Sequence, residues 1–322
     1  MSKKTKLFLL TGFLGAGKTT LLKNLLASID SKPVSPKLTA GVVINEFGKI
    51  NIDSAIIEKD RLDGLEIVEI NNGSIFCKCK EGLFIENVAA FAKMKLDYLF
   101  VETSGLSDPA NMESIVKHVN SITNNSFDFM GTICIIDALN FLKVYRTLNT
   151  VKRQINYSSI IIINKIDLVD SITLEEVIGK IQEINPLAKI IQTSFCKLHA
   201  HFLYEDSHWD NSEENSTDNY VYNTTFSRPK VLLVQANDTI NKENFLAFIK
   251  SFQEKTFRIK GFVKLHNGLN YVDIVGNEIV LEQSSLLRNI SEIVIIPMPG
   301  YDLKEEIERK WNEIIGVNIN II

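Results

Sequence analysis

Residues 12–20 of this chain read Gly-Phe-Leu-Gly-Ala-Gly-Lys-Thr-Thr and follow an apolar run at residues 7–10. Leucines with helical spacing come next, between positions 21 and 26. This order predicts a strand, a glycine-rich loop and a helix. Glycine lacks a Cβ atom, so such a loop can turn its backbone N–H groups toward phosphate oxygens, and the helix N-terminus adds partial positive charge. The stretch therefore predicts a site for a nucleoside triphosphate.

The residue types of this loop have separate expected tasks. We expect Lys18 to reach the β- and γ-phosphates and the hydroxyl of Thr19 to bind Mg2+. A glycine turn that binds nothing is the alternative, but the complete motif between a strand and a helix favours the phosphate site. The residues expected to surround the nucleotide phosphates are Gly12, Gly15, Ala16, Gly17, Lys18, Thr19 and Thr20.

Composition narrows the class of protein. The chain has 322 residues, of which 45% are hydrophobic and 23% charged, and this predicts a soluble globular protein with two domains. A net charge of −4 gives no electrostatic case for nucleic acid or membrane as a partner. Apolar runs are too short for a membrane span or a signal peptide. Four cysteines do not suggest a secreted disulfide framework, so we expect a cytoplasmic protein.

Carboxylates follow two further predicted strands, at residues 38–45 and 97–101. Asn-Glu-Phe-Gly follows the first strand and places Glu46 at the carboxyl edge of a parallel sheet, where ligands bind. A solvated loop carboxylate is an equally open interpretation of Glu46. Glu-Thr-Ser-Gly-Leu-Ser-Asp-Pro follows the second strand. There we expect Glu102 to contact Mg2+ through a water molecule and the Gly105 amide to lie near the γ-phosphate.

Four isoleucines at residues 160–163 predict a buried strand that ends in Asn-Lys-Ile-Asp. The carboxylate of Asp167 can accept hydrogen bonds from N1–H and the exocyclic amine of guanine, a pair of donors that adenine does not offer. Asn164 is expected to brace the loop, and Lys165 to pack its aliphatic stem over the base. The sequence therefore predicts GTP and GDP as the nucleotides.

Two cysteines, Cys77 and Cys79, alternate with two lysines after an Asn-Asn-Gly turn. Positive charge favours the thiolate, which is the form that binds a soft cation or attacks a disulfide. Two sulfurs supply half of a tetrahedral zinc site, so further ligands would have to come from elsewhere. Two inert cysteines near a strand end are the alternative interpretation.

The chain is predicted to divide at two places. Residues 1–195 form an α/β domain of the P-loop NTPase type, with a mostly parallel sheet flanked by helices. Residues 196–227 are acidic and contain His199, His201 and His208, which predicts an exposed linker or a loose metal-binding segment. Residues 228–322 are predicted to form a smaller α+β domain with helices on one face of an antiparallel sheet.

Taken in order, the motifs GFLGAGKTT, NEFG, ETSGLSDP and NKID, with the cysteine loop between the second and third, resemble the CobW-like family of SIMIBI-class P-loop GTPases. The resemblance covers residues 6–195, and the layout from residue 228 onward is similar to the family's smaller C-terminal domain. It implies a cytoplasmic GTPase that binds a transition metal such as Zn2+, Co2+ or Ni2+. The metal would be handed to a client metalloenzyme, or would help to activate one.

The chain departs from the family at its cysteine motif. The family sequence Cys-x-Cys-Cys falls on Ser74, Phe76 and Cys77 here, and Cys79 is additional. A site built on Cys77 and Cys79 would take further ligands from Glu46, Glu81, the histidine segment or a second subunit of a homodimer.

Our hypothesis is a Mg2+-dependent GTPase in which the nucleotide controls this metal site. Lys18 and Mg2+ would neutralise charge on the phosphates, while Glu102 or the Gly105 amide positions the water or the metal. Thr19, Glu46, Glu102, Cys77 and Cys79 are the candidate metal ligands. Two other functions stay open. One is a GTP-gated assembly or reactivation factor for a corrinoid or other cofactor-dependent enzyme, and the other is a thiol redox switch.

Overall fold

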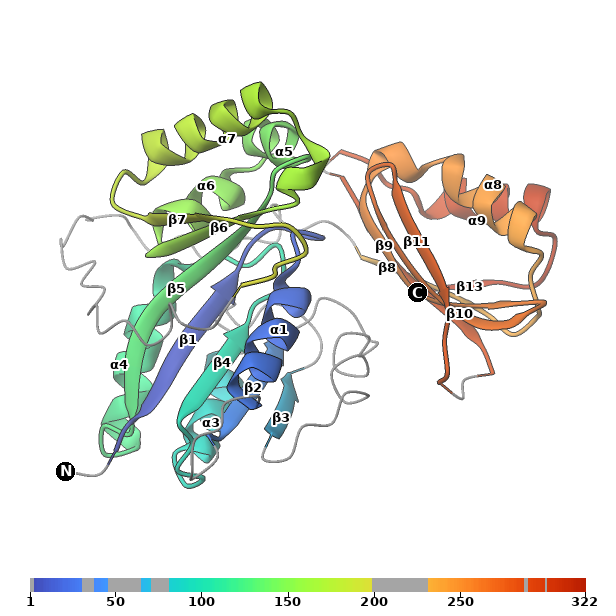
Figure 1. Cartoon of the computed structure of the whole chain (residues 1–322). Helices are drawn as coiled ribbons and strands as arrows, with labels where there is room; N and C mark the ends of the chain where they lie inside the picture. Colours follow the sequence, from blue (N-terminus) through green and yellow to red (C-terminus); the bar gives the residue numbers. More distant parts are fainter. Residues whose placement is uncertain are drawn as a thin grey trace. The chain divides into compact units, whose positions relative to one another are not determined.

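A computed structural model of the chain describes residues 3–30, 38–45, 65–70, 81–198, 231–286, 289–298 and 300–322. These residues fall into two compact units, one before and one after the gap at residues 199–230 (Figure 1). Each unit has its own sheet and its own apolar core. The predicted segment at residues 196–227 lies almost wholly outside the described residues, so its boundaries stay a prediction.

Seven parallel strands form the sheet of the first unit. They are β1 (Thr5–Thr11), β2 (Ala40–Asn45), β3 (Leu65–Ile70), β4 (Tyr98–Glu102), β5 (Phe127–Asp137), β6 (Ile160–Asn164) and β7 (Lys189–Gln192). Their order across the sheet is β3-β2-β4-β1-β5-β6-β7. In the register, Leu10 pairs with Glu102, and Asp137 pairs with Asn164. The carboxyl ends of β1, β4, β5 and β6 therefore lie at one edge of the sheet.

Helices cover both faces of this sheet (Figure 1). They are α1 (Lys18–Asp30), α3 (Glu81–Phe91), α4 (Met112–Ile122), α5 (Phe141–Thr147), α6 (Asn149–Asn156) and α7 (Ser171–Ile184). Side chains alternate along a strand, so Phe8 and Leu10 pack with α1 while Leu7 and Leu9 pack with α3 and α4. The central strands are buried on both sides because of this, which explains why their sequences read as continuous apolar runs. The α/β class predicted from the sequence is confirmed.

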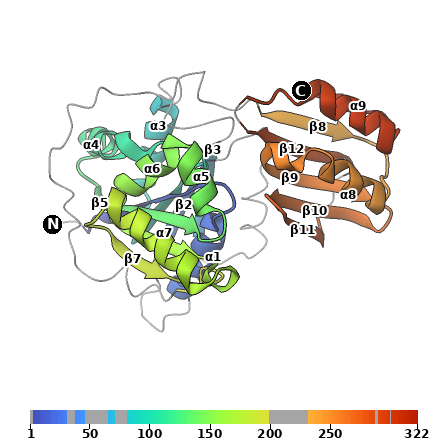
Figure 2. The same cartoon turned by 90° about the horizontal axis from the view of Figure 1, so that it is seen from above.

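The second unit is an antiparallel sheet in the order β11-β10-β9-β12-β8-β13, with two helices. The strands are β8 (Leu232–Ala236), β9 (Thr256–Leu265), β10 (Gly268–Val275), β11 (Glu278–Gln283), β12 (Ser291–Pro297) and β13 (Asn320–Ile321). The helices α8 (Lys242–Lys250) and α9 (Lys304–Ile314) pack on one face of this sheet (Figure 2). Phe248 and Trp311 of these helices share one apolar core with Ile259 and Ile293 of the sheet. The predicted α+β layout is confirmed, and β13 is an additional strand.

None of the described helices combines the length and the apolar character needed to cross a bilayer.

Candidate functional site

The loop between β1 and α1 has the backbone shape that its glycines predict. The φ angles of Gly12, Gly15 and Gly17 are +136°, +75° and +112°. Residues other than glycine rarely adopt backbone conformations in this region. A Cβ atom on Gly12 would lie 2.2 Å from the carbonyl oxygen of Ile135 in β5. Position 12 thus requires glycine both for its φ angle and for close packing against the neighbouring strand.

Lys18 is the first residue of α1, and its side chain turns back over the loop. Its Nζ atom donates to the carbonyl oxygens of Gly12, at 2.8 Å, and Phe13, at 3.2 Å. Only 7% of Lys18 is exposed, so the ammonium lies inside the loop rather than in solvent. Ala16 is fully buried beneath it, while Thr20 is exposed in the first turn of the helix.

Thr19 meets the carboxylate predicted at the end of the neighbouring strand. Its hydroxyl donates to Oε1 of Glu102 at 2.9 Å. Glu102 is the last residue of β4 and is 4% exposed. A hydroxyl that donates its proton to a carboxylate keeps its lone pairs for another partner. Hydroxyl and carboxylate oxygens are the hard ligands that Mg2+ takes, so this pair fits that ion.

Residues 103–108 form the loop after β4 and pack directly on the glycine loop. A Cβ atom on Gly105 would lie 2.6 Å from the backbone nitrogen of Leu14. The backbone N–H of Thr103 donates to the carbonyl of Leu10 at 2.9 Å, which continues the pairing of β4 with β1. The two stretches that the sequence assigns to phosphate recognition are therefore in contact.

Asn164, the last residue of β6, joins the glycine loop to the loop after β7. Its Nδ2 atom donates to the carbonyl of Ala16 at 2.9 Å, and its Oδ1 atom accepts from the backbone N–H of Cys196 at 2.9 Å. Asn24 of α1 holds the same loop from outside, because its Nδ2 donates to the Cys196 carbonyl at 2.7 Å. Phe195 and Cys196 have positive φ angles of 57° and 51°. These contacts hold a strained backbone at residues 195 and 196, beside the glycine loop.

Lys165 and Asp167 follow Asn164 on the same edge of the sheet. Lys165 has a φ angle of +62°, and its Nζ atom lies 3.0 Å from Oδ2 of Asp137 at the end of β5. Asp167 lies in a short 3-10 helix, η2 (Ile166–Leu168), and is exposed. An ion pair therefore fixes the direction of the lysine, while the neighbouring carboxylate faces solvent.

The glycine loop, Thr19, Glu102 and Asn164 all lie in the part of the chain that matches a nucleotide-binding family model. A family model described as "CobW/HypB/UreG, nucleotide-binding domain" matches residues 6–192. The chain belongs to this family. The match confirms the predicted CobW-like P-loop GTPase class.

Other proteins resemble the CobW-like chain over different lengths. "Zinc-regulated GTPase metalloprotein activator 1" of Dictyostelium discoideum is 24% identical over 363 residues, covering 98% of this chain and 74% of that protein. "Zinc chaperone CobW" of Sinorhizobium sp is 28% identical over 193 residues, covering 52% of each. The Zn(II)-bound YjiA GTPase from E. coli covers 97% of this chain and 99% of its own, with 18% identity and a TM-score of 0.47. The match therefore spans about half the length of the Sinorhizobium protein.

The transition-metal ligands predicted for this CobW-like chain lie outside the described residues. Glu46, Cys77 and Cys79 belong to residues 46–64 and 71–80, and the histidine segment belongs to residues 199–230. Among the residues that the structure does describe, no group of three or more His, Cys, Asp or Glu side chains could hold a metal ion. The thiol site therefore stays a prediction from the sequence.

The two cysteines that the structure describes are both buried and free. Burial raises the pKa of the Cys134 thiol to about 12, although nearby Lys18 acts in the opposite direction. Burial also raises the pKa of Cys196 to about 12. The Sγ atom of Cys196 lies 3.4 Å from the carbonyl oxygen of Gly17. Cys196 therefore packs in the core of the first unit, although the sequence places it at the start of the linker.

Three residues with structural roles at this site were not singled out from the sequence: Asp137, Gln154 and Cys196. Asp137 ends a buried strand, as Glu102 does, and that pattern could have identified it. Gln154 lies inside α6 between Arg153 and Ile155, and no local signal marks it. Its contacts with the loop after β4 are visible only in three dimensions.

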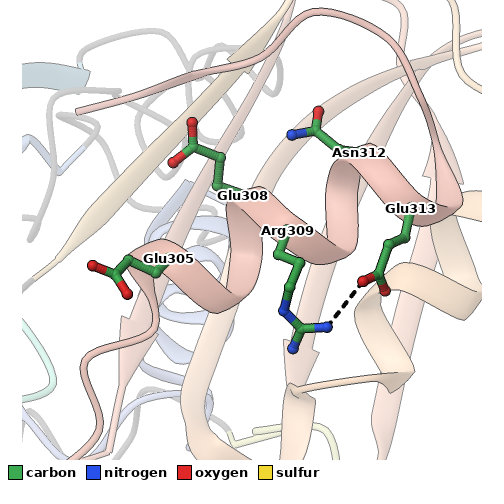
Figure 3. A pocket seen from close by; sticks show the side chains of 5 residues that line it. All are labelled: Glu305, Glu308, Arg309, Asn312 and Glu313. Atoms are coloured by element: carbon green, nitrogen blue, oxygen red, sulfur yellow. Dashed lines mark hydrogen bonds and ion pairs between the residues drawn. The ribbon is translucent and has the colours of Figure 1, made fainter.

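A shallow depression lies on α9 of the second unit, lined by Glu305, Glu308, Arg309, Asn312 and Glu313. Figure 3 shows the guanidinium of Arg309 directed toward Glu313, and the distance between Nη1 and Oε1 is 3.0 Å. Both side chains are largely exposed, and such pairs contribute little to stability. This surface has the character of a solvated helix face.

Proposed function

We propose that the protein is a Mg2+-dependent GTPase whose nucleotide state controls the binding of a transition metal and its transfer to a client metalloprotein. The hydrogen bond between Thr19 and Glu102 carries the enzymatic part of this proposal. It joins a partly buried residue in the first turn of α1 to the buried carboxylate at the end of β4. An arrangement of this kind positions a metal ion beside phosphates.

Different residues of the first unit have separate roles in the proposed hydrolysis. The buried ammonium of Lys18 and the backbone N–H groups of its loop stabilise negative charge on the phosphates. Thr19 and Glu102 would hold Mg2+, which supplies charge neutralisation when it is bound. The Gly105 amide is proposed to face the γ-phosphate, which is supported by the packing of Gly105 on Leu14. Removal of the γ-phosphate would then free the loop at residues 103–108 to move.

Selection of guanine is proposed for the loop after β6. Asp167 is exposed and can present its carboxylate to a base edge, while Asn164 fixes the loop against Ala16. Lys165 is directed by Asp137, which supports a fixed position for its stem beside the base. GTP and GDP are therefore the proposed nucleotides.

The proposed cargo is a thiophilic divalent cation, with Zn2+ first and Co2+ or Ni2+ as alternatives. Cys77 and Cys79 would bind it as thiolates, which the charges of Lys78 and Lys80 favour. The names of two relatives, a zinc-regulated GTPase metalloprotein activator and a zinc chaperone, support this part of the proposal. The proposed location is the cytoplasm, where thiols stay reduced, and the proposed partners are a client metalloenzyme and a second copy of the chain.

Equilibrium dialysis with Zn2+, Co2+ and Ni2+ tests the coupling of nucleotide and metal. We expect metal affinity to differ between the GTP-bound and GDP-bound protein, and Cys77→Ser with Cys79→Ser to abolish the high-affinity site. Cys134→Ala is the matched control because Cys134 is buried in the core, and it should leave metal binding unchanged. Unaltered metal affinity in the double variant would refute the metal-transfer proposal. In that case, retained GTPase activity would favour an assembly factor, and a mass shift on oxidation would favour a redox switch.

A further inference from the structure

Gln154 connects α6 to the loop after β4. Its side chain is fully buried, and its Nε2 atom donates to the carbonyl oxygens of Gly105, at 3.2 Å, and Ser107, at 3.0 Å. One NH2 group has two hydrogens, so both are committed to this loop. The two carbonyls lie two residues apart, which fixes the turn between them.

Arg153, the residue before Gln154, holds the end of the same loop. Its Nε atom lies 2.5 Å from Oδ2 of Asp108, and the other oxygen of Asp108 accepts from the backbone N–H of Ala110 at 3.1 Å. The side chain of Asp108 is 11% exposed, so solvent weakens this pair less than it weakens an open surface pair. Consecutive residues of α6 thus hold Gly105, Ser107 and Asp108.

The loop is also held from its other side. Thr103 bonds to the carbonyl of Leu10, and Gly105 packs against the backbone of Leu14. Ser104 and Ser107 close the turn, with 2.7 Å between their hydroxyl oxygens and a backbone bond of 3.0 Å from Ser107 N–H to the Ser104 carbonyl. Residues 103–108 therefore lie between the glycine loop and α6, and a movement of Gly105 must change its bond to Gln154.

The remaining polar atom of Gln154 points to a role beyond packing. Its Oε1 atom is buried and has no hydrogen-bond partner among the described residues. A buried acceptor without a partner is destabilising, so the Oε1 atom alone would not favour glutamine at this position. The glutamine is explained by the two bonds of its NH2 group, without which the carbonyls of Gly105 and Ser107 would each lose a donor.

We infer that Gln154 is a positioning residue that sets the place of the Gly105 amide, and that α6 responds through it to the presence of the γ-phosphate. This inference rests on the proposed function, since it assigns the Gly105 amide to that phosphate. When the loop moves, both bonds from Nε2 are lost together, and the Arg153–Asp108 pair transmits the change to the end of the loop. The discrimination between GTP and GDP thus depends on a side chain outside the recognised motifs.

The test is Gln154→Met, which keeps most of the side-chain volume and removes both donors. We expect the ratio of GTP affinity to GDP affinity, and kcat for GTP hydrolysis, each to fall about 10-fold, with GDP affinity almost unchanged. Asn120→Ala is the matched control. Asn120 is also an amide that bonds to backbone, donating to the Phe127 carbonyl at 2.9 Å and accepting from its N–H at 3.0 Å, at the opposite end of β5. This control should lose stability and keep the affinity ratio.

Gln154→Glu tests the inference through the pH dependence of the ratio of GTP affinity to GDP affinity. A purely structural role of Gln154 would not make this ratio depend on pH. A buried carboxyl has a raised pKa, and its protonated form has one O–H donor for the loop carbonyls. Lowering the pH should therefore restore part of the affinity ratio in Gln154→Glu, relative to wild type and Gln154→Met at the same pH. The inference would be overturned if the wild type discriminates GTP from GDP and both Gln154 variants keep the full affinity ratio. Failure of the wild type to bind GTP would instead overturn the proposed function.

Discussion

The side-chain amide of Asn164 joins the loop after β7 to the loop after β1. It donates to the carbonyl of Ala16 and accepts from the backbone N–H of Cys196, each at 2.9 Å. A Cβ atom on Gly17 would lie 2.7 Å from this amide and 2.9 Å from the Cys196 sulfur, so only glycine at position 17 allows the contact. The proposed base-binding and phosphate-binding parts of the site therefore share one buried residue.

Asn164→Asp removes one of the two hydrogen bonds of this side chain and keeps the other. The carboxylate can still accept from Cys196, but it faces the Ala16 carbonyl with an acceptor in place of a donor. We expect a loss of about 1–3 kcal/mol in the free energy of unfolding, measured with urea, and a weaker affinity for GTP by about 10-fold or more. Asn120→Ala, which affects a bond far from these loops, should lose stability without the change in GTP affinity. Full GTP affinity in Asn164→Asp would contradict the bracing role.

Glu102→Gln removes a charge while preserving a hydrogen bond. The amide oxygen of glutamine can still accept from Thr19, so the local geometry should survive. We expect kcat for GTP hydrolysis to fall on the order of 100-fold and the Mg2+ concentration needed for activity to rise, because a carboxylate near the metal is lost. Steady-state kinetics over a range of Mg2+ concentrations measures both effects. Glu113→Gln, on the exposed face of α4, should match wild type, and equal kinetics of the two variants would exclude a role for Glu102.

The sequence predicts the fold well where a segment is a continuous apolar run. The strands predicted at residues 38–45 and 97–101 overlap β2 and β4, and the isoleucine run lies in β6, because buried parallel strands are continuously apolar. The strand β13 was not predicted, since its two residues are too few to show the alternation of apolar and polar side chains that marks a strand. Its pairing with β8 depends on the fold of the second unit rather than on local sequence.

The site is predicted unevenly for a related reason. Motifs with fixed spacing identify Lys18, Thr19 and Asn164, whose chemistry is local to one loop. Gln154 contacts Gly105 across 49 positions of sequence, and Cys196 contacts Gly17 across 179, so only the tertiary structure brings these pairs together. Contacts of this kind join a motif to residues that are unremarkable in sequence.

Asp167→Asn tests the proposed guanine specificity. An amide presents a donor where the carboxylate accepted from the base, so GTP affinity should fall on the order of 100-fold while xanthosine triphosphate gains affinity. Asp167 is exposed, so the free energy of unfolding should change by less than about 0.5 kcal/mol. Competition binding with GTP, ATP and xanthosine triphosphate measures the change.

Asp170→Asn is the control for this prediction. Asp170 is a second exposed carboxylate three residues away, and it caps α7 by accepting from the Thr173 N–H at 2.7 Å. Asparagine caps helices equally well, so this variant should keep both stability and GTP preference. Equal binding of GTP and ATP by the wild type would refute the assignment of Asp167.

Thiol chemistry distinguishes the two pairs of cysteines. Burial raises the pKa of Cys134 and of Cys196 to about 12, so at neutral pH both stay protonated and their thiolates, which are the nucleophiles, are scarce. Their reactivity should increase only as the pH rises toward that value. Lys78 and Lys80 adjoin Cys77 and Cys79 and favour the thiolate there. We therefore expect two of the four thiols to react rapidly in the native protein at neutral pH.

Labelling with a thiol reagent, followed by peptide mass spectrometry, checks this assignment. Denaturation should expose all four cysteines, and saturation with Zn2+ should slow the labelling of Cys77 and Cys79 alone, because a coordinated sulfur is withheld from the reagent. Rapid native labelling of Cys134 or Cys196 would contradict their burial. Unchanged labelling of Cys77 and Cys79 in saturating Zn2+ would show that these thiols do not hold the metal.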